Sequence, residues 1–284
     1  MAGTSMKSIK LRIKSVESTM QITKAMELVA SSKLRRAKER MEKSRPYFTL
    51  MHGALAKIAA ANTDFSSVYV TRREVKKTCY VIIAGDRGLA GGYNANIFKQ
   101  TAAHMENKTV CALPIGKKAL EYCDRHHIEV LSREFACAED MTVRRCNEAA
   151  FVLTAGFREG QYDELYICYT NFVSMLSQQP AVMRVLPISY TKAETKEGGP
   201  HGLVLYEPSS EAVYDAIVPS YVSGMVYGAL CESVASEQGA RRTAMDAASK
   251  NAGDMIEGLN LRYNRSRQGA ITQEITEIVA GAEQ

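Results

Sequence analysis

Apolar residues recur with a helical period over residues 6–45. Steps of four and three residues place apolar or small side chains at eight of ten successive positions, and only Thr23 and Glu27 interrupt the pattern. The ten positions are Ile9, Ile13, Val16, Met20, Thr23, Glu27, Ala30, Leu34, Ala37 and Met41. A narrow stripe with this spacing predicts a long helix whose seam packs against a single partner helix in a coiled coil.

A weaker stripe of the same kind runs through residues 220–284. Its positions are Val234, Gln238, Arg241, Met245, Ala248, Ala252, Met255 and Leu259. The stripe loses its phase between Arg262 and Gly269 and resumes with Ile271, Ile275 and Ile278. We therefore expect a second long helix with an irregular stretch near its end.

The positions of proline and glycine bear on the length and the stability of these two helices. All seven prolines fall between Pro46 and Pro219, so both terminal segments lack the strongest helix breaker. The 65 residues from 220 to 284 would span roughly 95 Å as a helix, which is longer than a compact domain. This helix contains Gly239, Gly253, Gly258 and Gly269. Each glycine weakens an isolated helix by up to ~1 kcal/mol, so we expect another structure to clasp it.

The middle of the chain alternates between strand-like and helix-like stretches. The strand-like stretches are Lys77–Ala84, Thr109–Ile115, Ile128–Leu131, Glu164–Val173 and Ala181–Tyr190. The helix-like stretches are Asn94–Met105, Lys117–His126 and Asp140–Glu159, and Thr191–Gly202 is predicted to be an exposed loop. This order predicts an α/β domain with a mainly parallel sheet.

These patterns divide the chain into five predicted segments. Residues 1–60 form the first coiled-coil helix, 61–76 a linker and 77–190 the α/β domain. Residues 191–210 form an exposed loop with a short following segment, and 211–284 form the second coiled-coil helix.

A glycine-rich turn, Gly85–Gly92, follows the first predicted strand and precedes a helix. A dinucleotide-binding turn would lie at this place, but the Gly-x-Gly-x-x-Gly spacing is absent, as is the Gly-Lys-Ser/Thr of a P-loop. Asp86 would also put a carboxylate next to any phosphate held at a helix N-terminus. We therefore favour a tight turn in which Asp86 and Arg87 pair locally or face a partner, and we expect no bound cofactor.

Catalytic and metal-binding patterns are weak. The chain contains neither Gly-x-Ser-x-Gly nor His-Glu-x-x-His, and its five histidines are scattered. The seven cysteines form no Cys-x-x-Cys pair, and only His126 and His127 lie near one of them, Cys123. We predict reduced, mostly buried thiols, no metal site and no catalytic residues.

Composition and charge narrow the class of partner. With 46% hydrophobic and 24% charged residues, the chain is typical of a soluble protein. Its longest apolar run, Cys79–Ala84, is far shorter than the ~20 residues of a membrane helix, so we expect any membrane role to be peripheral. Residues 1–45 hold twelve Lys or Arg and four Asp or Glu, a net charge of +8 that leaves −3 for the rest of the chain. This arm fits a solvated face, an acidic protein surface or nucleic acid, although it lacks aromatic residues for base stacking before Tyr47.

The two terminal segments resemble a known family. Ser236–Ala252, Tyr263–Gln268 and Ile271–Ile278 resemble the C-terminal helix of the gamma subunits of F-type ATP synthases. Ile13–Val16 and Gln21–Ala30 resemble the first helix of that family.

The middle of the chain carries the same resemblance in the same order. Asp86–Gly92 matches the family's central signature, and Tyr206–Pro208 matches its stalk-base segment. Two departures are Gly85, where the family usually has serine, and Ala90, where it often has cysteine; both are expected to be tolerated packing variants. A long insertion with a regulatory cysteine pair is absent, so redox control is not expected.

The resemblance implies a fold and a set of partners. The terminal helices would form a long antiparallel coiled coil, attached to a central Rossmann-like α/β domain. The coiled coil would rotate as a central stalk inside a hexamer of alpha and beta subunits, and its base would meet the epsilon subunit and the membrane ring of c subunits. The chain would be non-catalytic, because nucleotides bind to the hexamer, and would reach the membrane only through the c-ring. A bacterial protein at the cytoplasmic face of the plasma membrane is expected.

The matching positions identify contact residues. For the alpha/beta hexamer they are Lys24, Met26, Arg241, Arg267, Gln268, Thr272 and Glu274. For the c-ring or epsilon they are Arg45, Tyr47, Tyr206 and Glu207. Simple coiled-coil packing is an equally good explanation for Met26.

Two other functions stay open on the sequence alone. One is a nucleotide-dependent α/β enzyme with helical arms. The absence of the Gly-x-Gly-x-x-Gly spacing counts against it. The other is a coiled-coil nucleic-acid binder that uses the basic arm, for which binding that weakens steeply with salt would be diagnostic.

Overall fold

A computed structural model describes residues 2–60, 65–189 and 206–282. The elements follow the order α1–β1–α2–β2–α3–β3–α4–β4–β5–α5. Contacts divide the chain into two units. One consists of the described parts of residues 1–31 and 241–284, which are segments of the two long helices; the other consists of the described parts of residues 32–240.

The larger unit is built on a five-stranded sheet in the order β3-β2-β1-β4-β5. The strands are β1 (Thr78–Ile83), β2 (Val110–Ile115), β3 (Glu129–Val130), β4 (Glu164–Phe172) and β5 (Gln178–Leu186). All neighbouring pairs are parallel except β4 and β5, which form an antiparallel hairpin at one edge. The predicted α/β class with a mainly parallel sheet is confirmed.

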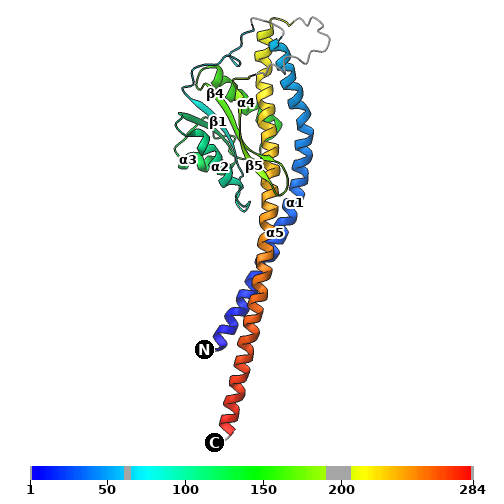
Figure 1. Cartoon of the computed structure of the whole chain (residues 1–284), viewed down its shortest axis with the longest axis vertical. Helices are drawn as coiled ribbons and strands as arrows, with labels where there is room; N and C mark the ends of the chain where they lie inside the picture. Colours follow the sequence, from blue (N-terminus) through cyan, green and yellow to red (C-terminus); the bar gives the residue numbers. More distant parts are fainter. Residues whose placement is uncertain (1, 61–64, 190–205, 283–284) are drawn as a thin grey trace. The chain divides into compact units, whose positions relative to one another are not determined.

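Helices cover both faces of this sheet, as Figure 1 shows. Helices α2 (Tyr93–Met105) and α3 (Lys117–Arg125) lie on one face. Helix α4 (Val143–Arg158) lies on the other, together with the adjoining parts of α1 (Ala2–Ala60) and α5 (Ser210–Ala282).

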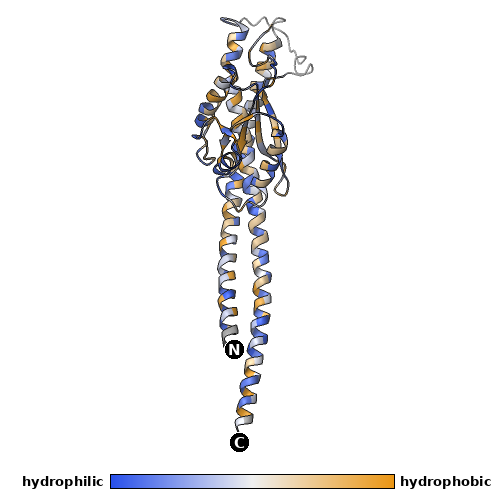
Figure 2. Ribbon diagram, turned by 90° about the vertical axis from the view of Figure 1, so that its left-hand side faces the viewer, coloured by the Kyte–Doolittle hydropathy of each residue, from blue (hydrophilic) through white to orange (hydrophobic). Residues whose placement is uncertain are grey.

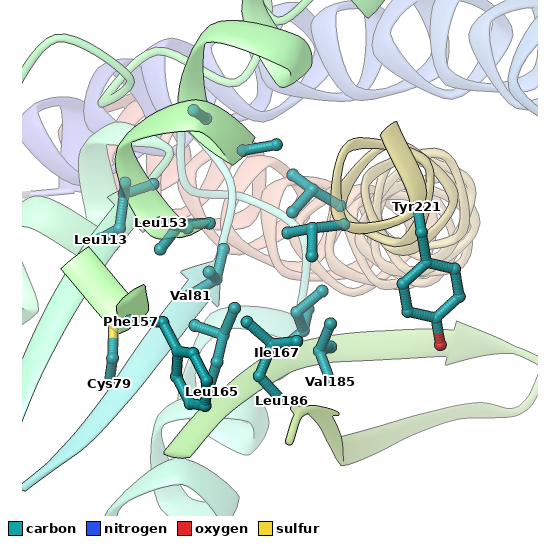
Figure 3. Packing of buried hydrophobic residues seen from close by; sticks show 14 of the residues in the cluster. Cys79, Val81, Leu113, Leu153, Phe157, Leu165, Ile167, Val185, Leu186 and Tyr221 are labelled. Atoms are coloured by element: carbon teal, nitrogen blue, oxygen red, sulfur yellow. The ribbon is translucent and has the colours of Figure 1, made fainter. Parts of the chain in front are cut away.

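The central strand explains this layering. All six residues of β1 are buried, and successive side chains point to opposite faces of a strand. Cys79, Val81 and Ile83 join the cluster with α4, α1 and α5, whereas Tyr80 and Ile82 join the cluster with α2 and α3. Figure 3 shows the first cluster, in which Phe157 of α4 and Tyr221 of α5 pack over the sheet. An unbroken apolar run is therefore required, because β1 has no solvent-facing side.

The two long helices extend past the two prolines that bound the proline-free terminal segments. Pro46 lies inside the 59-residue α1 and Pro219 inside the 73-residue α5. A proline in a helix removes one hydrogen bond, at a cost of ~3 kcal/mol or more. The core holds both helices on the flanks of these prolines: Met41 and Leu55 of α1 are buried on either side of Pro46, and Val218 of α5, next to Pro219, is completely buried. Tertiary packing thus overrides the local preference.

The remaining differences concern the ends of elements. Strand β5 lies at Gln178–Leu186 rather than Ala181–Tyr190, because a short hairpin pairs Phe172 with Gln178. Helix α4 begins at Val143 rather than Asp140, because the Thr142 hydroxyl caps it by accepting from the Arg145 N–H at 3.3 Å. The predicted loop Thr191–Gly202 falls outside the described residues. Among the residues that are described, no helix combines the length and the apolar character needed to cross a membrane.

Candidate functional site

The seam on α1 lies where its periodicity predicted. In the unit that contains residues 2–31, Ile9, Ile13, Val16 and Met20 are half-buried, and most residues between them are exposed. Thr23 and Ala30 are buried and Glu27 is half-buried, so the seam continues through the two polar positions. The predicted seam is confirmed, and Thr23 and Glu27 are part of it.

The facing stripe on α5 differs from the predicted one. Met245 and Ala252 are buried as expected, but Met255 is 47% exposed and its neighbour Ile256 is half-buried instead. Beyond it, the half-buried positions are Leu259, Tyr263, Ser266 and Ala270. The stripe therefore does not lose its phase between Arg262 and Gly269. The prediction failed there because tyrosine, serine and alanine carry little hydrophobic signal.

A hydrogen bond joins the two helices inside this seam. The hydroxyl oxygens of Thr23 and Ser249 lie 2.7 Å apart, and the Thr23 hydroxyl also lies 3.0 Å from the carbonyl oxygen of Met20. Opposed small polar side chains let the helices approach closely. Because the pair is satisfied at one register, it favours that register over neighbouring ones.

The seam buries little apolar surface. Within the described residues of this unit, the buried apolar side chains are Ala30, Met245 and Ala252. Figure 2 shows apolar positions along both long helices. Outside the seam, the exposed large apolar residues are Leu11, Ile22, Leu28, Val29, Met255, Leu261, Ile271, Ile275, Ile278 and Val279. We call this set the outer apolar surface.

The outer apolar surface was only partly predicted. Ile271, Ile275 and Ile278 were expected to resume the seam, but they are 47%, 57% and 70% exposed. Leu28 and Leu261, which are 66% and 72% exposed, were missed. The signal in the sequence was an apolar residue out of phase with the seam. Exposed apolar residues in this number mark a surface that another molecule covers.

The residues assigned to the alpha/beta hexamer all lie in this unit. Lys24 is exposed and Met26 half-buried on α1. On α5, Arg241 is half-buried, and the other four assigned residues are exposed. Those four are Arg267, Gln268, Thr272 and Glu274. The Thr272 hydroxyl donates to the carbonyl oxygen of Gln268 at 2.9 Å, so it reaches a partner mainly as an acceptor.

The residues assigned to the stalk base lie in the other unit. Tyr47 is exposed on α1, and Glu207 is exposed just before α5. Tyr206 is half-buried because it packs against the core of the sheet. The side chain of Arg45 lies outside what the structure describes. The two predicted contact sets are thus separated into the two units of the chain.

The glycine-rich turn is organised by Asp86. Its carboxylate accepts from the backbone N–H groups of Lys117, Ala138 and Glu139 at 2.9, 3.0 and 2.9 Å. The Cys137 thiol lies 3.6 Å from the same carboxylate. Burial raises the pKa of Asp86, but these hydrogen bonds outweigh it and hold the pKa below its ordinary value. Asp86 therefore ties together the turn, the start of α3 and the loop before α4.

This arrangement counts against a phosphate site at the N-terminus of α3. A phosphate at the N-terminus of α3 would need the Lys117 N–H, which Asp86 already occupies. Gly116 precedes this helix with φ of +100°, and a Cβ there would lie 2.0 Å from the carbonyl oxygen of Ala84. Arg87 is 79% exposed and makes a loose ion pair of 3.8 Å with Glu139. Asp86 and Arg87 are therefore both paired within the chain, but with groups distant in sequence rather than locally.

The other side chains that could bind a metal or take part in catalysis are dispersed over the structure. Six cysteines are buried and Cys137 is half-buried. Among residues 2–60, 65–189 and 206–282, no three His, Cys, Asp or Glu side chains gather as a metal site. The Tyr80 hydroxyl lies 2.9 Å from Nδ1 of His104, and Lys108 approaches both. Burial and the charge of Lys108 lower the pKa of His104.

Comparisons with known proteins agree along nearly the whole chain. Residues 5–284 match the family model described as ATP synthase. The sodium-ion-specific ATP synthase gamma chain of Acetobacterium woodii is 44% identical, over 97% of this chain and 97% of that protein. The ATP synthase gamma chain of Alkaliphilus metalliredigens is 43% identical, over 99% of both.

Solved structures share the fold. A chain in the mitochondrial ATP synthase of Euglena gracilis superposes with a TM-score of 0.67, covering 99% of this chain and 94% of that one at 18% identity. A chain in a central stalk and c-ring structure from Tetrahymena thermophila gives a TM-score of 0.59 at 24% identity, covering 80% and 99%. At these identities the likeness concerns the fold alone.

Proposed function

This chain belongs to the gamma-chain family of the ATP synthases, and from that membership we propose that it is the central rotor subunit of an F-type ATP synthase. In this role it couples ion flow through a membrane ring of c subunits to ATP synthesis or hydrolysis in an alpha/beta hexamer. The chain itself is non-catalytic, because the nucleotide sites lie in the beta subunits. It associates with the membrane peripherally, through the c-ring.

The outer apolar surface is the observation that carries this proposal. A two-helix unit with Ala30, Met245 and Ala252 as its buried apolar side chains has too little core to be stable by itself. Its exposed leucines and isoleucines lie on both helices, outside the seam that joins them, whereas a single docking partner would cover one face. A sleeve formed by several subunits covers such a surface from all sides.

The rotor works through differential contacts. A coiled coil with different side chains around its circumference presents a different profile to each beta subunit. Each orientation shifts the populations of the beta-subunit conformations by its difference in contact energy with them. Rotation therefore alternates the nucleotide affinities of the three sites. Exposed groups such as Arg267 and Gln268 are suited to hydrogen bonds with the surrounding loops, since a guanidinium pairs bidentately with a carboxylate.

The base of the rotor uses the other unit. Tyr47 and Glu207 are exposed, and we assign them, with Tyr206 and Arg45, to contacts with the c-ring or the epsilon subunit. In this assignment the two-helix unit contacts the hexamer, and the unit that carries the sheet contacts the c-ring or the epsilon subunit. Torque then passes along the two helices that belong to both units.

The test is reconstitution with the alpha and beta subunits of the same organism. Native mass spectrometry should find one copy of this chain per hexamer. ATP hydrolysis by that complex should be lost when residues from Ile271 onward and the N-terminal helix are deleted. If the chain purifies alone and leaves hexamer activity unchanged, the rotor assignment is wrong.

A pair of substitutions separates sleeve contact from folding. Leu28→Ser and Leu261→Ser remove exposed side chains that contribute little to packing within the chain. We expect both variants to keep their helix content and to lower ATP hydrolysis by the assembled complex. Leu50→Ser, at a residue 72% exposed in the other unit, is the matched control and should leave hydrolysis of the soluble complex unchanged.

A further inference from the structure

A cavity of about 320 Å³ lies between α4 and the first turns of α5, within the unit that carries the sheet. This volume falls at the lower end of the ~300–1,000 Å³ that small-molecule sites occupy. Phe151 and Ala155 of α4 form one apolar wall, and Ala216 and Pro219 of α5 form the other. Phe151 is 63% exposed, which is unusual for a phenylalanine and leaves its ring available at the mouth of the cavity. The proposed rotor function assigns no role to this cavity.

Two opposite charges line the cavity from different helices. Arg158 is at the end of α4, and Asp215 is in the second turn of α5. In the described part of the chain they make no ion pair with each other within 4.0 Å, and Ser67 donates to one oxygen of Asp215 at 2.6 Å. Both charges act on the phenol of Tyr69, a buried residue that also lines the cavity. Burial raises its pKa, Arg158 opposes this rise and Asp215 adds to it.

Pro219 leaves the backbone carbonyl of Asp215 without its usual helical donor, on the same side of the cavity as the Asp215 carboxylate. An ordinary residue there would donate its N–H to the carbonyl of Asp215, four residues earlier in the helix, but proline has no N–H. Asp215 thus contributes a carboxylate and a backbone carbonyl that lacks its usual helical donor. One side of the cavity offers acceptors, and the other offers the donors of the Arg158 guanidinium.

We propose that this cavity binds a small zwitterion of the α-amino-acid class, with its carboxylate on Arg158, its ammonium group on Asp215 and a short apolar side chain against Phe151. A guanidinium binds a carboxylate through two parallel N–H donors, and an ammonium group has three donors for the acceptors of Asp215. Neither a simple anion nor a simple cation satisfies both ends of the cavity. A bound zwitterion would join α4 to the start of α5 and so stiffen the attachment of the long helix to the α/β core.

Isothermal titration calorimetry on the full chain tests this assignment with L-leucine as the probe. Leucinamide keeps the ammonium group but lacks the carboxylate, and 4-methylpentanoate keeps the carboxylate but lacks the ammonium group. We expect saturable binding of one leucine per chain and at least tenfold weaker binding of both analogues. These comparisons use the unaltered protein, so they do not depend on the folding of a variant.

Two variants then assign the ends of the ligand. Arg158→Gln should bind leucine and leucinamide equally weakly, whereas Asp215→Asn should no longer distinguish leucine from 4-methylpentanoate. Arg125→Gln, on the opposite face of the sheet, is the control and should bind leucine like the unaltered chain. Absence of saturable leucine binding up to about 10 mM would overturn the proposal, because specific sites bind more tightly. Equal binding of all three compounds would also overturn it. Because the assay uses the chain alone, neither result bears on the rotor function.

Discussion

Asp86→Ala should be among the most destabilising single substitutions on the surface of the larger unit. The substitution removes the acceptor of three backbone N–H groups, from Lys117, Ala138 and Glu139, at 2.9–3.0 Å. A hydrogen bond to a charged acceptor contributes ~1.5–3 kcal/mol, and the lower end applies because Asp86 is half-buried. Three such bonds give a loss of about 4 kcal/mol.

Asp86→Asn should cost less, because the amide oxygen can still accept from Lys117 and Ala138. Those two bonds become neutral, at ~1 kcal/mol each, and the amide NH2 would face the N–H of Glu139. A loss of about 2 kcal/mol is expected. Urea denaturation of the full chain, followed by tyrosine fluorescence and circular dichroism, measures both values. Asp124→Asn is the matched control, because its carboxylate pairs with Arg133 on the exposed surface and should contribute little.

The pH dependence supplies an independent check. The folded-state pKa of Asp86 lies below its ordinary value of 3.8, so its stabilising effect is fully present above that pH. The effect is lost as the pH falls through the lowered pKa, and the difference between the unaltered chain and Asp86→Asn should shrink there. If Asp86→Ala unfolds within 0.5 kcal/mol of the unaltered chain, a change typical of ordinary surface substitutions, the reasoning about this carboxylate is refuted.

Four further tests concern other parts of the structure. Gly116→Ala forces a Cβ to 2.0 Å from a carbonyl oxygen at a φ of +100°, so we expect a loss of more than ~3 kcal/mol in urea denaturation. Gly258→Ala meets nothing within 4 Å and should raise the helix content of the isolated chain, by up to ~1 kcal/mol of helix stability; a decrease would contradict the exposed placement of this residue. A double-mutant cycle of Thr23→Val with Ser249→Ala should show coupling of about 1 kcal/mol, and additive effects would mean that their hydrogen bond does not form. His104 has a folded-state pKa below its ordinary 6.5, so it contributes stability above that pH which is lost as the pH falls through the lowered pKa. The unaltered chain should therefore lose more stability than His104→Gln between pH 7.5 and 5.5, and NMR titration of the imidazole should give the lowered pKa directly.

The sequence predicted those elements whose signal is local. Strand β1 is buried on both faces, so its apolar run is unbroken and easily recognised. The α1 seam was predicted because its apolar side chains repeat strictly, and one polar member, Thr23, finds its partner in Ser249. Pro46 and Pro219 lie inside these helices, and the packing that keeps them helical comes from residues distant in sequence.

The candidate surfaces were harder to predict than the fold. The seam is defined by a repeat, whereas Leu28 and Leu261 are recognised as surface residues only once the seam has been located. Asp86 shows the same limit, since its carboxylate is bound by N–H groups that follow it by 31, 52 and 53 residues. Spacing within the turn suggested local pairing, but the number of donors depends on the tertiary structure.

The glycines of α5 support the proposal that a sleeve of other subunits surrounds this helix. Gly239 lies close to other parts of the chain, because a Cβ there would come into contact with the ring of Phe172 at 3.4 Å. At Gly253, Gly258 and Gly269 a Cβ would meet nothing within 4 Å, so packing inside this chain gives no reason for glycine. Each of the three nevertheless lowers helix stability by up to ~1 kcal/mol. A reason must therefore come from outside the chain, and close approach of a surrounding wall supplies one, since a missing Cβ lets another backbone come nearer. The same stretch buries few apolar side chains of its own and exposes Leu261 and Ile271. Weak internal packing, open glycines and exposed apolar residues on one helix segment are together what a shaft inside a close-fitting sleeve requires.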